Sequence, residues 1–98
     1  MTQEQHALDI VTETQGLCDR LERAVREGER PTDVLNLVYQ LVPVGFSLPP
    51  GMYRQWAAFS ITRTLWRIGR KDEAQAMMLT VIDEGFLLKL QEDCPGMF

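Results

Sequence analysis

The fold is decided by the stretch Gly51–Gly85, GMYRQWAAFSITRTLWRIGRKDEAQAMMLTVIDEG. It contains two helical patterns joined by a short turn at 68–73, and it holds both tryptophans, five of the ten basic residues and three of the five methionines. Apolar residues that recur three and four positions apart form one face of a helix. We therefore expect one helix over about 52–68 and another over about 72–84, with Gly85 as the residue that ends the second.

The first of these two helices carries apolar residues on two sides. At about 100° per residue, one side is a normal core face made by Ala57, Ala58, Ile61, Leu65 and Ile68. The roughly opposite side is rich in tryptophan, arginine, methionine and phenylalanine, and we call it the second face. It consists of Met52, Trp56, Phe59, Arg63, Trp66, Arg67 and Arg70.

A helix that is apolar on two sides either lies at the centre of its bundle or offers one side to another molecule. In the first interpretation the second face is internal, and Arg63 and Arg67 pair with the C-terminal acids or with Glu13, Asp19 or Glu22. In the second interpretation it is a binding surface, because tryptophan and arginine dominate the energetics of protein interfaces. The residues leave both interpretations open.

The first thirty residues predict a long helix. Thr2 and Gln5 form a capping-box pattern, and the apolar spacing that follows indicates an amphipathic helix of about seven turns. Gly28 is expected to end it.

Two cysteines, Cys18 on this helix and Cys94 near the C-terminus, fit reduced thiols better than a disulfide framework.

A second helix is expected between Pro31, which suits a first turn, and Pro43, which should end it. A strand is the alternative for this short, valine-rich run, but no partner strand is evident. Residues 43–51, PVGFSLPPG, are expected to form a loop. Periodicity does not decide whether residues 86–91 form a short helix or an extended segment.

These patterns predict an all-α protein with a single domain over residues 1–98. Its expected architecture is a compact bundle of four main helices, arranged as two antiparallel helical hairpins, with a short fifth C-terminal helix as the open question.

The net charge is −4. No apolar run approaches the ~18–20 residues of a membrane span, and the N-terminus lacks the layout of a signal peptide. We therefore expect a cytoplasmic protein that does not enter a membrane.

Residues suited to catalysis or metal binding are scarce. His6 is the only histidine, and neither cysteine stands at ligand spacing from it, so no metal site and no cofactor are expected. Ser47 and Ser60 have no neighbouring base in the sequence. Adjacent carboxylates such as Asp72 and Glu73 stand near expected helix ends, where capping explains them. The sequence predicts a protein that is not an enzyme.

The turn Gly69–Ala74, GRKDEA, followed by Ile82, resembles the turn and second helix of a tetratricopeptide-type hairpin. The resemblance implies stacked helical hairpins that form a groove for partner peptides. Lys71 replaces the tyrosine of the family's turn, and the family's Trp-Leu-Gly signature is absent from the preceding helix. The resemblance is therefore one of architecture.

The leading functional hypothesis is a small protein-binding module that acts on a larger protein or complex through the second face, as an inhibitor, adaptor or chaperone-like protein. A phage-encoded or bacterial accessory protein fits this profile. Two alternatives remain: a nucleic-acid-associated protein that uses the Arg63, Arg67 and Arg70 stripe, and a structural homodimer. A sequence pI near 4.9 weighs against the nucleic-acid alternative.

Overall fold

The computed structural model describes residues 2–98 and is all-α: five helices connected by short segments, with no strand in the described part. This confirms the prediction of an all-α protein. The helices are α1 (Gln3–Arg26), α2 (Pro31–Phe46), α3 (Met52–Arg67), α4 (Lys71–Met78) and α5 (Glu84–Asp93). No helix among the described residues is long and apolar enough to cross a membrane.

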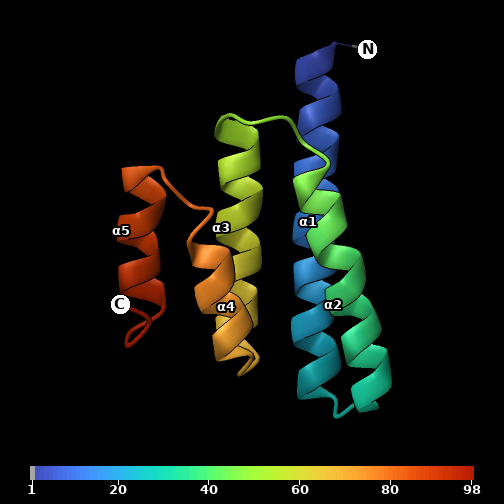
Figure 1. Cartoon of the computed structure of the whole chain (residues 1–98). Coiled ribbons are helices and arrows are strands. Elements are labelled where there is room, and N and C mark those ends of the chain that lie inside the picture. Colours follow the sequence, from blue (N-terminus) through green and yellow to red (C-terminus); the bar gives the residue numbers. More distant parts are fainter. Residues whose placement is uncertain (1) are drawn as a thin grey trace.

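The central element is α3, which packs against each of the other four helices. Figure 1 shows α2 crossing in front of α1 and α4 in front of α3, with α5 standing on the far side of α3 from α1. Since α5 packs against α3 alone among the helices, the position of the C-terminal part of the chain depends on α3. The largest fully buried apolar side chains are Leu21, Leu41, Ile61, Leu65 and Leu90.

The first helix begins where the capping pattern predicts. The side chain of Thr2 accepts a hydrogen bond from the backbone N–H of Gln5, at 3.0 Å, which satisfies one of the N–H groups that have no partner within the helix. Gly28 follows its C-terminal end with a φ of +70°, a conformation that glycine adopts without the steric cost that a Cβ imposes.

The prediction that Pro43 ends the second helix is wrong. α2 continues through Pro43 to Phe46, so the predicted loop at 43–51 shrinks to residues 47–51. Proline removes one helical hydrogen bond and crowds the preceding turn. Packing offsets that cost here, because Gly45 is buried against Ile61 of α3.

The predicted fourth helix is also too long. α4 ends at Met78 instead of Glu84, and Gly85 lies inside α5 instead of ending α4. Thr80 donates from both its backbone N–H and its hydroxyl to the carbonyl of Met77, at 2.9 and 2.7 Å. Asp83 then caps the next helix by accepting from the N–H of Phe86, at 3.1 Å. Residues 86–91 are therefore helical, and the fold contains a well-formed fifth helix.

Candidate functional site

The centre of the second face is covered by the chain itself. Phe59 is only 5% exposed, and its ring stacks on the ring of Phe86 from α5, with centroids 5.1 Å apart. This geometry suits aromatic pairs, which contribute about 0.5–1.5 kcal/mol beyond the burial of their area. Phe59 therefore lies in the contact between α3 and α5, as the internal interpretation of the second face expects for this residue.

Arg63 and Trp66 extend this contact. The guanidinium carbon of Arg63 lies 4.9 Å from the centroid of the Phe59 ring, and its Nη1 donates to Oδ2 of Asp93 at 3.4 Å. Trp66 is half-buried, with the ammonium of Lys71 4.9 Å from its ring centroid. A Cβ at Gly96 would stand 3.8 Å from the same ring. Both α5 and the residues that follow α5 therefore pack against α3.

The arginines of the predicted stripe each face a carboxylate. Arg63 pairs with Asp93, Arg67 lies 3.7 Å from an oxygen of Glu22, and Arg70 lies 2.6 Å from an oxygen of Glu73. Pairs exposed to this degree are worth at most about 1 kcal/mol each. They do reduce the positive charge that the stripe can offer to a polyanion.

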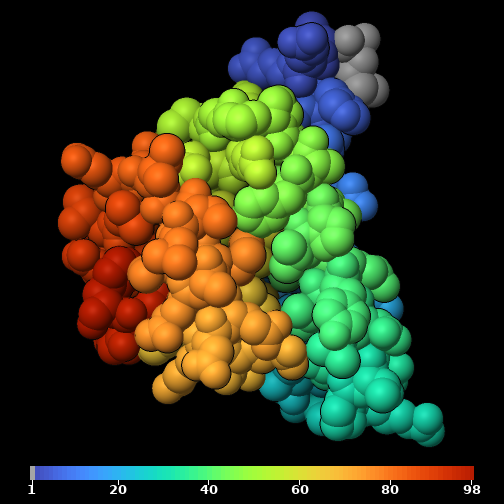
Figure 2. Space-filling view, in the orientation of Figure 1, coloured from blue at the N-terminus to red at the C-terminus, as the bar shows by residue number. Residues whose placement is uncertain are grey.

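Among the apolar residues of the second face, only the two at its N-terminal end are exposed. Met52 is 61% exposed and Trp56 is 36% exposed. In Figure 2, the residues of α4 (orange) cover the front of α3 between α2 (green) and α5 (red), while the first turn of α3 and the loop before it (yellow-green) remain uncovered. The structure therefore separates the residues that the sequence grouped together.

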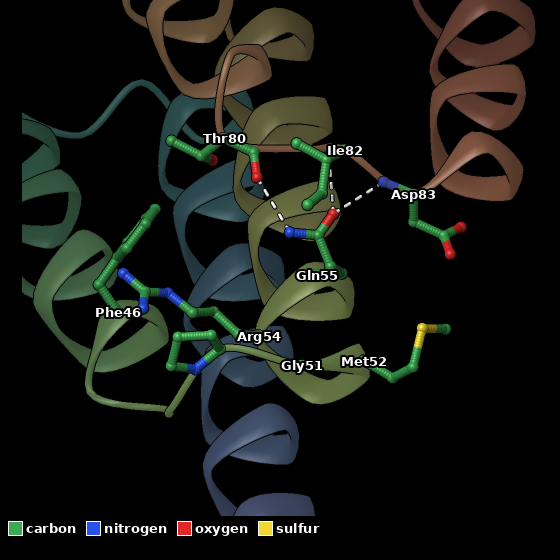
Figure 3. A pocket seen from close by; sticks show the side chains of 9 residues that line it. Phe46, Gly51, Met52, Arg54, Gln55, Thr80, Ile82 and Asp83 are labelled. Atoms are coloured by element: carbon green, nitrogen blue, oxygen red, sulfur yellow. Dashed lines mark hydrogen bonds between the residues drawn. The ribbon is translucent and has the colours of Figure 1, made fainter.

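A pocket of about 560 Å³ opens beside Met52 (Figure 3). It lies between the loop that precedes α3 and the segment that joins α4 to α5. Ile82, which is 77% exposed, stands at this pocket as a second apolar side chain. The residues that line it are Phe46, Pro50, Gly51, Met52, Arg54, Gln55, Thr80, Ile82 and Asp83.

One wall of the pocket is fixed by the side chain of Gln55. Its Nε2 donates to the carbonyl of Thr80 at 3.0 Å, and its Oε1 accepts from the N–H groups of Ile82 and Asp83 at 2.7 and 3.0 Å (Figure 3). These bonds satisfy backbone groups that α4 and α5 leave without helical partners. Gln55 thereby holds the connecting segment against α3 and sets the position of Ile82.

Replacing Gln55 by alanine is expected to lower the free energy of unfolding by about 2 kcal/mol, because three hydrogen bonds are lost together. Urea denaturation followed by circular dichroism measures this change. Gln75→Ala is the matched control, since Gln75 lies exposed on α4, and it should change stability by less than about 0.5 kcal/mol. Equal effects of the two substitutions would contradict the role given to Gln55.

Arg54 is placed at the pocket by Phe46. Its guanidinium carbon lies 4.9 Å from the centroid of the Phe46 ring, a cation–π arrangement. No carboxylate within residues 2–98 forms an ion pair with Arg54. The pocket therefore combines apolar side chains with one carboxylate, Asp83, and one cation, Arg54, that can pair with a carboxylate from outside.

Sequence reasoning missed most of this pocket. Ile82 falls within the predicted helix over about 72–84, which in the structure ends at Met78, and the sequence patterns indicate no functional role for Phe46 or Gln55. The spacing of Ile82 after Ala74 fits a continuous helix perfectly well. The only sequence signal against it was Thr80 and Asp83, two residues that favour helix ends over helix interiors.

The cysteines are buried free thiols. Burial raises the pKa of Cys18 to about 11, and burial also raises the pKa of Cys94. Both side chains therefore remain protonated at neutral pH and are poor nucleophiles. No group of three or more histidine, cysteine or acidic side chains in the described part is arranged to hold a metal ion.

Comparison of the chain with models of protein families, with curated proteins and with solved structures gives no match.

Proposed function

We propose that this protein is a non-enzymatic binding module that acts on a larger protein or complex, in the manner of an adaptor, inhibitor or chaperone. The observation that carries the proposal is the exposure of Met52 and Ile82 at one apolar-lined pocket. Apolar side chains gathered around a concavity are typical of sites that bind other molecules. The scaffold of this site is a pair of antiparallel helical hairpins, α1–α2 and α3–α4.

The chemistry of the pocket defines the partner. Met52 and Ile82 favour a bulky apolar side chain, and methionine adapts to irregular shapes because its side chain is flexible. Arg54, held over Phe46, favours a carboxylate beside that side chain. We infer a partner segment in which an acidic residue lies next to an aromatic or branched aliphatic one.

The proposed site keeps part of the predicted one. Met52 and Trp56 remain as surface residues of the second face, whereas Phe59 is removed from it. Arg63, Arg67 and Arg70 are engaged by Asp93, Glu22 and Glu73. Together with the net charge of −4, this pairing favours a protein partner over nucleic acid.

Met52→Asp is expected to reduce capture of the partner at least about tenfold, which corresponds to about 1.4 kcal/mol of binding free energy. The reason is that a carboxylate at the pocket is costly to bury and repels the acidic residue inferred for the partner. Leu88→Asp is the matched control, because Leu88 on α5 is 60% exposed and does not line the pocket. Affinity capture with quantitative mass spectrometry compares the two variants with the natural chain.

A photo-crosslinking amino acid at position 82 and another at position 88 make the test specific to the site. A protein that crosslinks from 82 but not from 88, and that Met52→Asp releases, supports the proposal. Capture that both aspartate variants leave unchanged refutes it. Crosslinks to a second copy of the same chain alone would replace the larger partner by a homodimer.

A further inference from the structure

A second cavity of about 140 Å³ lies between α1 and α3, and its lining is polar. Two rows of side chains face each other across it, each with the spacing i, i+3, i+4, i+7 of a single helix face. Helices usually meet along such faces through apolar side chains. Here the rows are Gln15, Cys18, Asp19 and Glu22 on α1 and Ser60, Arg63, Thr64 and Arg67 on α3.

Two buried donors at this cleft have no partner. Ser60 is 2% exposed, and its hydroxyl oxygen makes no hydrogen bond. The Nε of Arg63 is likewise buried and unbonded. Two of the three other buried hydroxyls behave differently: Thr14 and Thr62 donate to the carbonyls of Ile10 and Ala58, four residues earlier. Buried polar groups without a partner are rare in folded proteins, and each calls for a reason.

Both arginines of the cleft retain hydrogen-bonding capacity. The contact of Arg63 with Asp93 is 3.4 Å long and that of Arg67 with Glu22 is 3.7 Å long, longer than the 2.7–2.9 Å of strong charge-assisted bonds. Each guanidinium carries five N–H donors. The α3 side of the cleft therefore offers two cations and the Ser60 hydroxyl on one helix face.

We propose that the α1–α3 cleft binds a small oxyanion, a phosphate or a carboxylate group, between Ser60, Arg63 and Arg67. An oxyanion is an acceptor with no donor requirement of its own, so it matches the unpaired Ser60 hydroxyl and Arg63 Nε. The volume is that of about four to five water molecules at roughly 30 Å³ each, which limits the ligand to a small ion or a single functional group.

The acidic side chains of the same cleft set the affinity. Asp19 and Glu22 also line it, so two carboxylates oppose the two guanidinium groups and repel an anion. A dissociation constant of about 1 mM is therefore expected. The site is independent of the pocket at Met52 and shares no lining residue with it.

The test is an NMR titration of the full chain with inorganic phosphate and, separately, with acetate, each against sodium chloride of equal ionic strength. Saturable shifts of the amides of residues 15–22 and 60–67 are expected with at least one of the two anions, and their relative affinities distinguish phosphate from carboxylate. Ser60→Ala and Arg67→Gln should each weaken binding about fivefold or more, as expected for the loss of a buried or charged donor.

Two variants serve as matched controls. Thr62→Val removes a buried hydroxyl on the same helix that already has a partner, and Arg70→Gln removes an arginine that does not line the cleft. Both should leave the affinity within about twofold of that of the natural chain, since neither touches the proposed ligand. Two results would overturn the proposal: shifts no larger than chloride produces, or binding that survives both Ser60→Ala and Arg67→Gln.

Discussion

Replacing Phe59 by alanine is expected to lower the free energy of unfolding by about 4 kcal/mol, within the range for deletion of a buried aromatic ring. The Phe59 ring is 5% exposed and stacks on Phe86. It also lies beneath the guanidinium of Arg63. Its removal leaves a cavity at the junction of α3 with α5. Urea denaturation followed by circular dichroism gives the change directly.

Trp56→Ala provides the comparison on the same face. Trp56 is 36% exposed, so Trp56→Ala should lower the free energy of unfolding by less than Phe59→Ala does, by about 1–2 kcal/mol. If Phe59→Ala lowers the free energy of unfolding by no more than Trp56→Ala does, the assignment of Phe59 to the core is contradicted.

Hydrogen exchange of the α5 amides adds a local measurement. Because α5 packs against α3 alone among the helices, few other contacts compensate for the lost aromatic stack. Local opening of α5 should therefore become easier in Phe59→Ala by more than the opening of α1 or α2. Uniform acceleration in all helices would instead indicate that α5 unfolds only together with the whole domain.

The two-sided pattern of α3 could be predicted from the sequence, but the cover of its second side could not. Apolar residues on both sides of 52–68 indicated a central helix or a binding helix, and the second side is covered along part of its length and exposed along the rest. Phe59 packs inside, whereas Met52 stays exposed. Which residues of the second face are covered depends on where α5 begins. Two opposing local preferences set the end of α4 and the start of α5. The spacing of Val81 and Ile82 favours a longer α4, whereas the hydrogen bonds of Thr80 and Asp83 end it.

The same kind of competition occurs at Pro43. Local chemistry favours a break, because the proline has no N–H to donate. Tertiary packing favours three more helical residues, since they bring Gly45 against α3 and place Phe46 under Arg54. The sequence shows the missing N–H of Pro43, but it does not show the packing of Gly45 and Phe46. The pocket beside Met52 was missed for this reason, because Phe46 forms part of its wall.

Gly45→Leu is expected to lower the free energy of unfolding by about 3 kcal/mol, the upper part of the usual range for overpacking. A Cβ at position 45 would stand 2.6 Å from Cδ1 of Ile61 and 3.5 Å from Cβ of Ala57, so the larger side chain must displace the buried Ile61 side chain and overpack the contact between α2 and α3. Gly16→Leu is the matched control: it also lies within a helix, with nothing within 4 Å of its added Cβ. That substitution should leave stability unchanged or raise it by up to about 1 kcal/mol, because glycine is a poor helix former.

A double-mutant cycle locates the cause of the Gly45 effect. Ile61→Val removes the Cδ1 atom that the new Cβ would meet, so Gly45→Ala should be more favourable in the Ile61→Val background than in the natural chain by about 1 kcal/mol. Chemical denaturation of the four proteins of the cycle measures this coupling. Additive effects, together with a harmless Gly45→Leu, would mean that residue 45 lies in an open loop, as the three prolines around it suggest. A positive coupling instead shows that residue 45 packs against Ile61, as it does in the helix that continues through Pro43.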